Sequence, residues 1–147
     1  MNKRCKVTIF LVDDDALFLK SLEIEFLSYP QFVVQTFAMG ELCLMSLCNK
    51  LNRPEVIILN YHLDGIDKNA MNGMETLDEI KAKDPKMPVI MLSSQDKIDI
   101  AVDCMHHKAS DYIVKSETAF VRLQASIDNI FKYQRMQKEL FWYIHIM

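Results

Sequence analysis

Short apolar runs rich in β-branched residues alternate with segments of helical periodicity, and no other feature of this chain restricts its fold as strongly. Five runs are predicted to be strands: residues 7–12, 32–37, 56–59, 89–92 and 111–114. Four segments between them are predicted to be helices: residues 16–28, 41–49, 74–83 and 98–107. Regular alternation of this kind predicts an α/β fold, a doubly wound parallel sheet with helices on both faces.

The strand runs differ in character, which predicts their place in the sheet. Residues 7–12, 56–59 and 89–92 are almost continuously apolar, as expected for central strands that are covered on both faces. Gln35 and Thr36 interrupt the run 32–37, so this strand is expected at an edge. Ligands of such sheets bind at the carboxyl ends of the strands, and functional residues are therefore sought there.

The charge balance excludes some partners. The chain has 147 residues with 17 basic and 20 acidic side chains, a net charge of −3, so no direct nucleic-acid binding is expected. Three aspartates follow the first apolar run where an export signal would have small residues, and no run approaches the roughly 18 residues of a membrane span. We therefore expect a cytoplasmic location without a membrane partner.

Four cysteines are too far apart in the sequence to form a C-x-x-C pair. They are Cys5, Cys43, Cys48 and Cys104. Because they lie in apolar surroundings, we expect buried, reduced thiols in preference to disulfides or a zinc site.

Asp13, Asp14 and Asp15 follow directly on the first strand. Adjacent carboxylates repel one another, and a hard divalent cation such as Mg²⁺ would offset that repulsion. The alternative is that the run only caps the next helix, with Asp15 as the best capping residue. The other strand ends favour a shared site, because Asn60, Ser93 and Lys115 end the third, fourth and fifth strands.

At this point the sequence resembles the receiver domains of two-component response regulators, a family that includes the single-domain chemotaxis regulators. The resemblance extends over residues 6–130, and five segments carry it: residues 10–14, 54–63, 71–73, 88–93 and 109–115. It implies a flavodoxin-like fold with strand order 2-1-3-4-5 and signalling by phosphotransfer from a histidine kinase or phosphotransfer protein to a downstream protein target.

The resemblance also assigns roles to single residues. It implies that Asp13, Asp14, position 60 and the backbone carbonyl of His62 bind Mg²⁺, and that position 60 is the phosphoacceptor. Ser93 would bond a phosphoryl oxygen and Lys115 would pair with the phosphoryl group. Ser93 and Tyr112 would be the switch residues.

Asn60 departs from the family, because an amide offers no competent nucleophile for the phosphoryl group. We expect a phosphorylation-deficient chain, without enzymatic activity of its own, and weaker Mg²⁺ binding than an aspartate would give. Two origins are compatible with the sequence: a natural pseudo-receiver, or a substitution that fixes the unphosphorylated state.

Two further departures concern the surroundings of the site. Ser116 follows Lys115 where the family commonly has a proline after a cis bond, which leaves the position of Lys115 open. The connection 61–73 is long, and its Asp64 and Asp67 are expected to be solvated turn residues in preference to metal ligands.

The last segment, residues 117–147, is predicted to be one helix of about 30 residues, or roughly 45 Å, which is longer than the domain can cover. Four residues are expected to pack on the sheet: Phe120, Leu123, Ile127 and Ile130. Beyond them a short heptad stripe suggests a homodimer contact: Tyr133, Met136, Leu140, Tyr143 and Met147. We therefore divide the chain into a receiver domain (1–131) and a helical extension (132–147).

Two other function classes are compatible with parts of the sequence. A haloacid-dehalogenase-like phosphatase also uses Asp-x-Asp after a first strand, and residues 13–15 satisfy that spacing, but no acidic pair follows a later strand. A constitutive protein-interaction module would need no phosphoacceptor, which fits Asn60.

Overall fold

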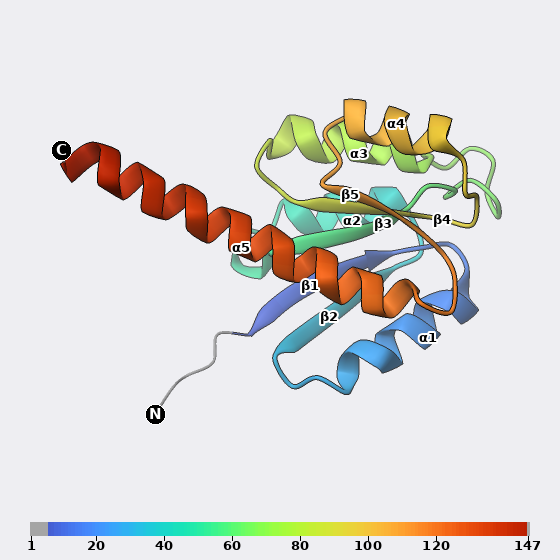
Figure 1. Cartoon of the computed structure of the whole chain (residues 1–147). Helices are drawn as coiled ribbons and strands as arrows, with labels where there is room; N and C mark the ends of the chain where they lie inside the picture. The colour runs from blue at the N-terminus through green and yellow to red at the C-terminus, as the bar shows by residue number, and fades with distance from the viewer. Residues whose placement is uncertain (1–5, 147) are drawn as a thin grey trace.

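The computed structural model describes residues 6–146, and strands and helices alternate along them (Figure 1). The strands are β1 (Val7–Val12), β2 (Phe32–Phe37), β3 (Val56–Asn60), β4 (Val89–Ser93) and β5 (Asp111–Val114). The helices are α1 (Ala16–Leu27), α2 (Gly40–Leu47), the short 3-10 helix η1 (Lys50–Asn52), α3 (Gly73–Lys83), α4 (Ile98–His106) and α5 (Ala119–Ile146). The bounds predicted for the five strands and the first four helices agree with these within two residues.

The strands form one parallel sheet in the order β2-β1-β3-β4-β5, which confirms the expected flavodoxin-like arrangement. Every residue of β3 and β4 is buried, as their continuous apolar runs predict. β2 is an edge strand, consistent with the interruption at Gln35 and Thr36. The pairing of Asn60 with Leu92 and of Ser93 with Val114 brings the carboxyl ends of three strands together at one edge.

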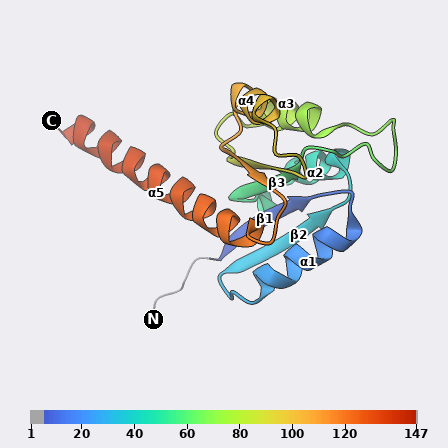
Figure 2. The ribbon, with the colours of Figure 1, turned by 45° about the vertical axis from the view of Figure 1, so that its right-hand side comes forward.

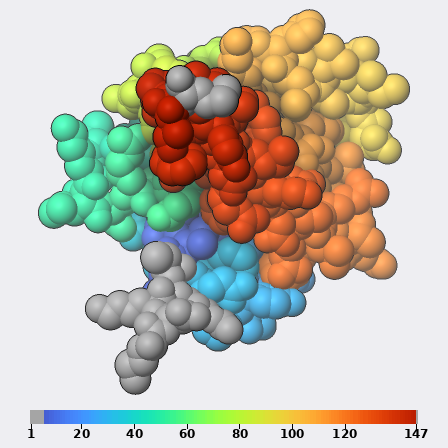
Figure 3. Space-filling view, turned by 60° about the vertical axis from the view of Figure 1, so that its left-hand side comes forward, coloured from blue at the N-terminus to red at the C-terminus, as the bar shows by residue number. Residues whose placement is uncertain are grey.

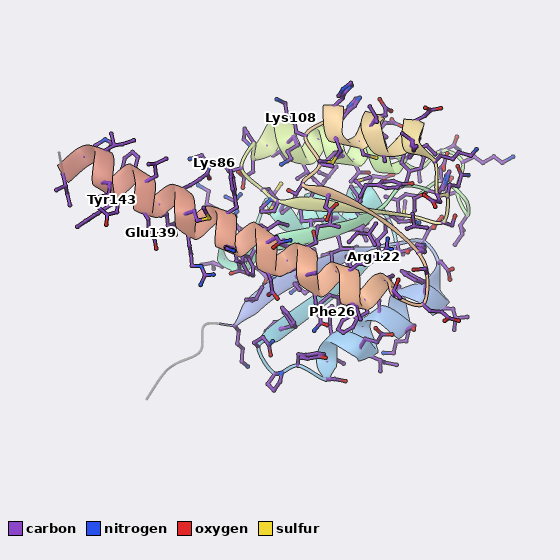
Figure 4. All side chains as sticks on the ribbon, viewed as in Figure 1. Phe26, Lys86, Lys108, Arg122, Glu139 and Tyr143 are labelled. Atoms are coloured by element: carbon purple, nitrogen blue, oxygen red, sulfur yellow. The ribbon has the colours of Figure 1, made fainter. Side chains whose placement is uncertain are left out.

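Helices cover both faces of the sheet and create two cores (Figure 2). α2, α3 and α4 cover one face, where Cys43, Leu77 and Cys104 are fully buried. α1 and α5 cover the other, where Phe26 of α1, labelled in Figure 4, contacts Phe120 edge to face with ring centroids 5.0 Å apart. The central strands β3 and β4 are therefore closed to water on both faces, and the edge of the sheet at the carboxyl ends carries the polar groups.

Local signals define the helix starts. The Asp15 carboxylate accepts hydrogen bonds from the backbone N–H groups of Leu17 and Phe18, which confirms its predicted capping of α1. Asn72 and Glu75 form a capping box at the start of α3. Of the three consecutive aspartates, Asp15 thus caps the helix. Helix capping does not account for Asp13 and Asp14.

The cysteine prediction is partly wrong. Cys43 and Cys104 are buried free thiols, and burial raises the pKa of Cys43 to about 12. Cys48 is exposed, and it is the C-cap residue that follows the last turn of α2. Cys5 lies outside the described residues.

A surface ion pair joins α3 to α4 and gives a pH-dependent prediction. His107 Nδ1 lies 2.7 Å from an Asp78 carboxylate oxygen, and this hydrogen bond raises the pKa of His107. The stabilisation is expected to be complete below the unfolded histidine pKa of about 6.5 and to be lost as the pH rises through the raised folded pKa. Urea unfolding at several pH values should show this loss, of less than about 1 kcal/mol for an exposed pair, in the unchanged chain. The His107→Gln variant should lack it, and equal pH profiles would contradict the prediction.

α5 is longer than the sheet it covers (Figures 1 and 2). Leu123 and Ile127 are buried against the sheet, and Phe120 and Ile130 are half-buried there, as predicted. Residues 132–146, which we call the overhang, extend beyond the body for about 22 Å, and all except Gln134 are exposed. Among residues 6–146 no helix is both long enough and apolar enough to cross a membrane.

Candidate functional site

Four side chains predicted from the strand ends lie in or beside one buried polar cluster. Asp13 follows β1, Asn60 and Ser93 end β3 and β4, and these three are at most 4% exposed. Lys115 follows β5, and its Nζ lies 2.7 Å from Asp13 Oδ2. Asn60 Nδ2 lies 2.9 Å from Asp13 Oδ1. Asp13 is therefore the centre of the cluster, with a cation on one oxygen and an amide on the other.

The orientation of the Asn60 amide follows from what surrounds it. Its nitrogen donates to Asp13 Oδ1 and, over 2.6 Å, to the backbone carbonyl of His62. Both neighbours are acceptors only, so the amide must present its N–H groups to them and not its oxygen. Asn60 thus bridges the carboxylate of Asp13 and the carbonyl of His62.

The charge of Asp13 is stabilised from several sides. Burial raises the pKa of Asp13, while Lys115 and the backbone N–H of Asp15, 2.9 Å from Oδ1, act in the opposite direction. Lys115 itself is 15% exposed, and its ammonium lies 4.3 Å from the centre of the Phe18 ring of α1. Every peptide bond in the described part of the chain is trans, so Lys115 reaches Asp13 without the family's cis bond.

Asp14 is turned toward the long connection after β3. Its carboxylate accepts a hydrogen bond of 3.1 Å from the backbone N–H of Gly65, which fixes the start of the loop near the cluster. Asp67 accepts from the N–H of Asn69 within a turn and is exposed, as expected of a turn residue. Asp64 is half-buried in the same connection.

Gly73 closes that connection against β3. A β-carbon at this position would lie 2.4 Å from the backbone oxygen of Asn60 and 2.5 Å from that of Tyr61. The N–H of Gly73 also donates to the Tyr61 oxygen over 3.0 Å. Only glycine allows the first residue of α3 to lie this close to the backbone of Asn60 and Tyr61.

Replacing Gly73 by alanine is therefore expected to destabilise the fold by about 3 kcal/mol, at the upper end of overpacking costs, because the obstacles are backbone atoms that cannot turn aside. Chemical denaturation measures the effect. Gly65→Ala is the matched control, since a β-carbon there meets only the Asp14 carboxylate, at 3.1 Å. Equal losses for the two variants would contradict the steric argument.

The two predicted switch residues meet at a residue that sequence reasoning missed. Ser93 Oγ accepts a hydrogen bond of 3.1 Å from the N–H of Gln95, and the Tyr112 hydroxyl donates to the Gln95 carbonyl over 2.5 Å. The main chain of Gln95 thus links the buried serine to the half-buried tyrosine. No sequence signal marks this role, because it uses backbone atoms only.

This arrangement provides a divalent cation with few free ligands. The Asp13 and His62 oxygens that the sequence suggests as ligands already accept from the Asn60 amide, and the other Asp13 oxygen faces Lys115. Within residues 6–146 no three His, Cys, Asp or Glu side chains are grouped so as to hold a metal ion. In this orientation the Asn60 amide turns its N–H donors, and not its oxygen, toward the oxygens expected to bind the metal.

Comparison with known proteins agrees with the resemblance noted in the sequence. Residues 9–128 match the family model of the response regulator receiver domain. The protein-glutamate methylesterase/protein-glutamine glutaminase of Bacillus licheniformis is 38% identical over 109 residues, which is 71% of this chain and 28% of that protein. The transcriptional regulatory protein PrrA of Mycobacterium tuberculosis is 33% identical over 107 residues, 73% of this chain and 42% of PrrA. The chain thus spans less than half the length of these two relatives.

A solved structure supports the same fold. The response regulator receiver domain protein from Clostridium thermocellum superposes with a TM-score of 0.75 at 25% identity, over 89% of this chain and 98% of that one.

Proposed function

Because the chain belongs to the response regulator receiver domain family, we propose that it is a two-component receiver that does not accept a phosphoryl group at position 60. Receiver domains interact with histidine kinases and downstream effectors, and they generally bind Mg²⁺ at the phosphorylation site. In this chain Asn60 and Lys115 would hold the acidic site together in place of the metal, and Mg²⁺ would bind weakly.

One observation carries this proposal: the Asn60 nitrogen lies within hydrogen-bond distance of both Asp13 Oδ1 and the His62 carbonyl. Phosphotransfer needs a carboxylate oxygen with a free electron pair to attack the phosphorus. The amide nitrogen has no such pair, and it is fully used as a donor. Position 60 would therefore support the site's structure without reacting.

The roles of the remaining residues follow. Asp13 would hold Lys115 and Asn60 in place, Asp14 would fix the loop through Gly65, and Ser93 and Tyr112 would set the position of Gln95. Neither phosphotransfer nor dephosphorylation at position 60 is expected, so we assign the chain no enzymatic activity. The family assignment gives no support to the phosphatase or the separate interaction module considered above.

Incubation with acetyl phosphate and Mg²⁺, followed by intact mass measurement, tests the proposal. We expect no phosphoryl adduct on this chain and an adduct on the Asn60→Asp variant. A stable adduct on the unchanged chain would overturn the proposal. Failure of both to react would show that the surrounding site is inactive for a reason other than Asn60.

We further propose a cytoplasmic location, a histidine kinase or phosphotransfer protein as upstream partner and a downstream protein target. The division into a receiver domain (1–131) and an extension (132–147) leads to a third proposed partner, a second copy bound through the overhang. Sedimentation of a chain ending at Lys132 tests this contact. If the shortened chain has the same oligomeric state as the full chain, the result argues against the contact.

A further inference from the structure

The overhang exposes more apolar surface than a solvated helix end normally does. Eight of its large side chains are between 57% and 63% exposed: Tyr133, Met136, Leu140, Phe141, Trp142, Tyr143, Ile144 and Ile146. From position 140 onward His145 is the sole polar residue of the described chain, so the tip is apolar around its whole circumference. A helix that is apolar all round is normally buried on all sides.

A groove lies between the overhang and the body. Its volume is about 1150 Å³, and its outer wall is α5, including Ile130, Tyr133, Phe141 and Trp142. Lys86, Pro88, Ser110 and Asp111 form the opposite wall, at the ends of the loops that lead into β4 and β5. Figure 4 shows Lys86 beside α5, and in Figure 3 the overhang points toward the viewer, in front of the body. The side chains of Ile130, Phe141 and Trp142 make the α5 wall partly apolar.

We propose that this groove receives the tip of α5 from a second copy of the chain, and that the exchange is reciprocal. A two-fold axis would place the overhang of each copy in the groove of the other, so that both tips are covered at once. This deepens the self-association proposed above and is independent of the chemistry at Asn60.

Covering the tip on several sides favours the groove over a simple two-stranded contact. A seam along Tyr133, Met136, Leu140 and Tyr143 buries one stripe and leaves Trp142 and Ile146 on the outside. In the groove the tip would meet the partner's helix on one side and the partner's body on another. Insertion into the groove therefore accounts for apolar residues on all sides of the tip, whereas a contact along one stripe accounts for one side only.

The sequence of the groove-facing side suits an antiparallel partner. Ile130, Gln134, Gln137 and Phe141 follow one another at spacings of four, three and four. Laid antiparallel, Phe141 of each copy would face Ile130 of the other, and Gln137 would face Gln134. Two apolar layers would thus enclose a central pair of amide layers that can bond each other.

The available area approaches that of a stable dimer. An aromatic side chain buries about 150–250 Å² when covered, so four aromatics at about 60% exposure offer roughly 400–600 Å² per copy. These are Tyr133, Phe141, Trp142 and Tyr143. The total for two copies, roughly 800–1,200 Å² before the aliphatic residues are added, approaches the 1,200–2,000 Å² typical of stable interfaces.

Analytical ultracentrifugation of the full chain tests the exchange. We expect a dimer whose dissociation constant rises about ten-fold or more in Ser110→Phe, which fills the groove from the body side, and in Phe141→Glu, which charges the tip. Trp142 is the single tryptophan of the chain, so its emission should shift to shorter wavelength as the concentration of the unchanged chain rises. The shift should be absent in Ser110→Phe.

Two matched variants separate the groove from its alternatives. Gln31→Phe adds the same ring at an exposed position away from the groove, and Met136→Glu adds the same charge at an overhang residue that does not line the groove. Both should leave the dissociation constant within about two-fold. A dimer broken by Met136→Glu but not by Ser110→Phe would establish the seam instead and overturn the exchange. A chain that stays monomeric throughout would overturn it as well.

Discussion

The Asn60→Asp variant is expected to be less stable than the unchanged chain by about 3 kcal/mol in the absence of metal. Two charges about 5 Å apart repel by roughly this amount at an effective dielectric near 20, and the new carboxylate would lie beside Asp13, whose Oδ1 is now 2.9 Å from the amide nitrogen. The variant also loses the donor that satisfies the His62 carbonyl. Urea unfolding at neutral pH with a chelator measures the difference.

Mg²⁺ should reverse that order. An aspartate at position 60 would add a third carboxylate to those of Asp13 and Asp14. Lys115 alone would then not balance the negative charge of the cluster, and a bound cation would be favoured. We therefore expect a marked rise in the melting temperature of Asn60→Asp with Mg²⁺ and little change for the unchanged chain. Equal Mg²⁺ affinities of the two forms would contradict this account. Asn60→Ala, which removes the amide without adding charge, separates the loss of hydrogen bonds from the repulsion.

Removing the ammonium of Lys115 is expected to cost about 3 kcal/mol at neutral pH, because it leaves a buried charge without its partner. The Lys115→Met variant keeps much of the stem's length beside Phe18 while exposing Asp13 to the full effect of burial. Without Lys115 the pKa of Asp13 should lie further above its ordinary value. The folded state then holds the proton more tightly than the unfolded chain, so stability falls as the pH rises above about 3.9.

Denaturation of Lys115→Met across this pH range should show a deficit that grows from acid to neutral conditions. The double variant Asp13→Asn with Lys115→Met is the control, since no buried charge remains and the pH dependence should disappear. A deficit that is independent of pH would show that Lys115 stabilises the fold by packing alone. Arg122, an exposed residue of α5, can be changed to Met for comparison (Figure 4).

The fold could be predicted largely from the apolar runs, because strands covered on both faces need continuous apolar sequence. β3 and β4 nevertheless extend one residue further than predicted, since Asn60 and Ser93 take the last positions of the sheet despite being polar. Cys48 was misplaced because apolar neighbours in sequence do not decide which side of a helix end faces the core.

The site could be predicted as a set of residues but not as an arrangement. Parallel strands necessarily bring Asp13, Asn60 and Ser93 to one edge, and this follows from the sequence alone. The direction of the Asn60 amide depends on the loop that returns the His62 carbonyl to it, and that loop depends on Gly73. Gln95 was missed for a similar reason, since only its main chain takes part.

Because the main chain of Gln95 is hydrogen-bonded to both Ser93 and Tyr112, a change at either residue can affect the other. Ser93 holds its N–H from inside the cluster, and Tyr112 holds its carbonyl from the side of α4. Linkage is reciprocal, so a protein that binds one position of Tyr112 more tightly must also alter the free energy of the surroundings of Ser93. In a chain with an amide at position 60, the surface at α4 and β5 would then act as the input and the strand-end cluster as the part that responds.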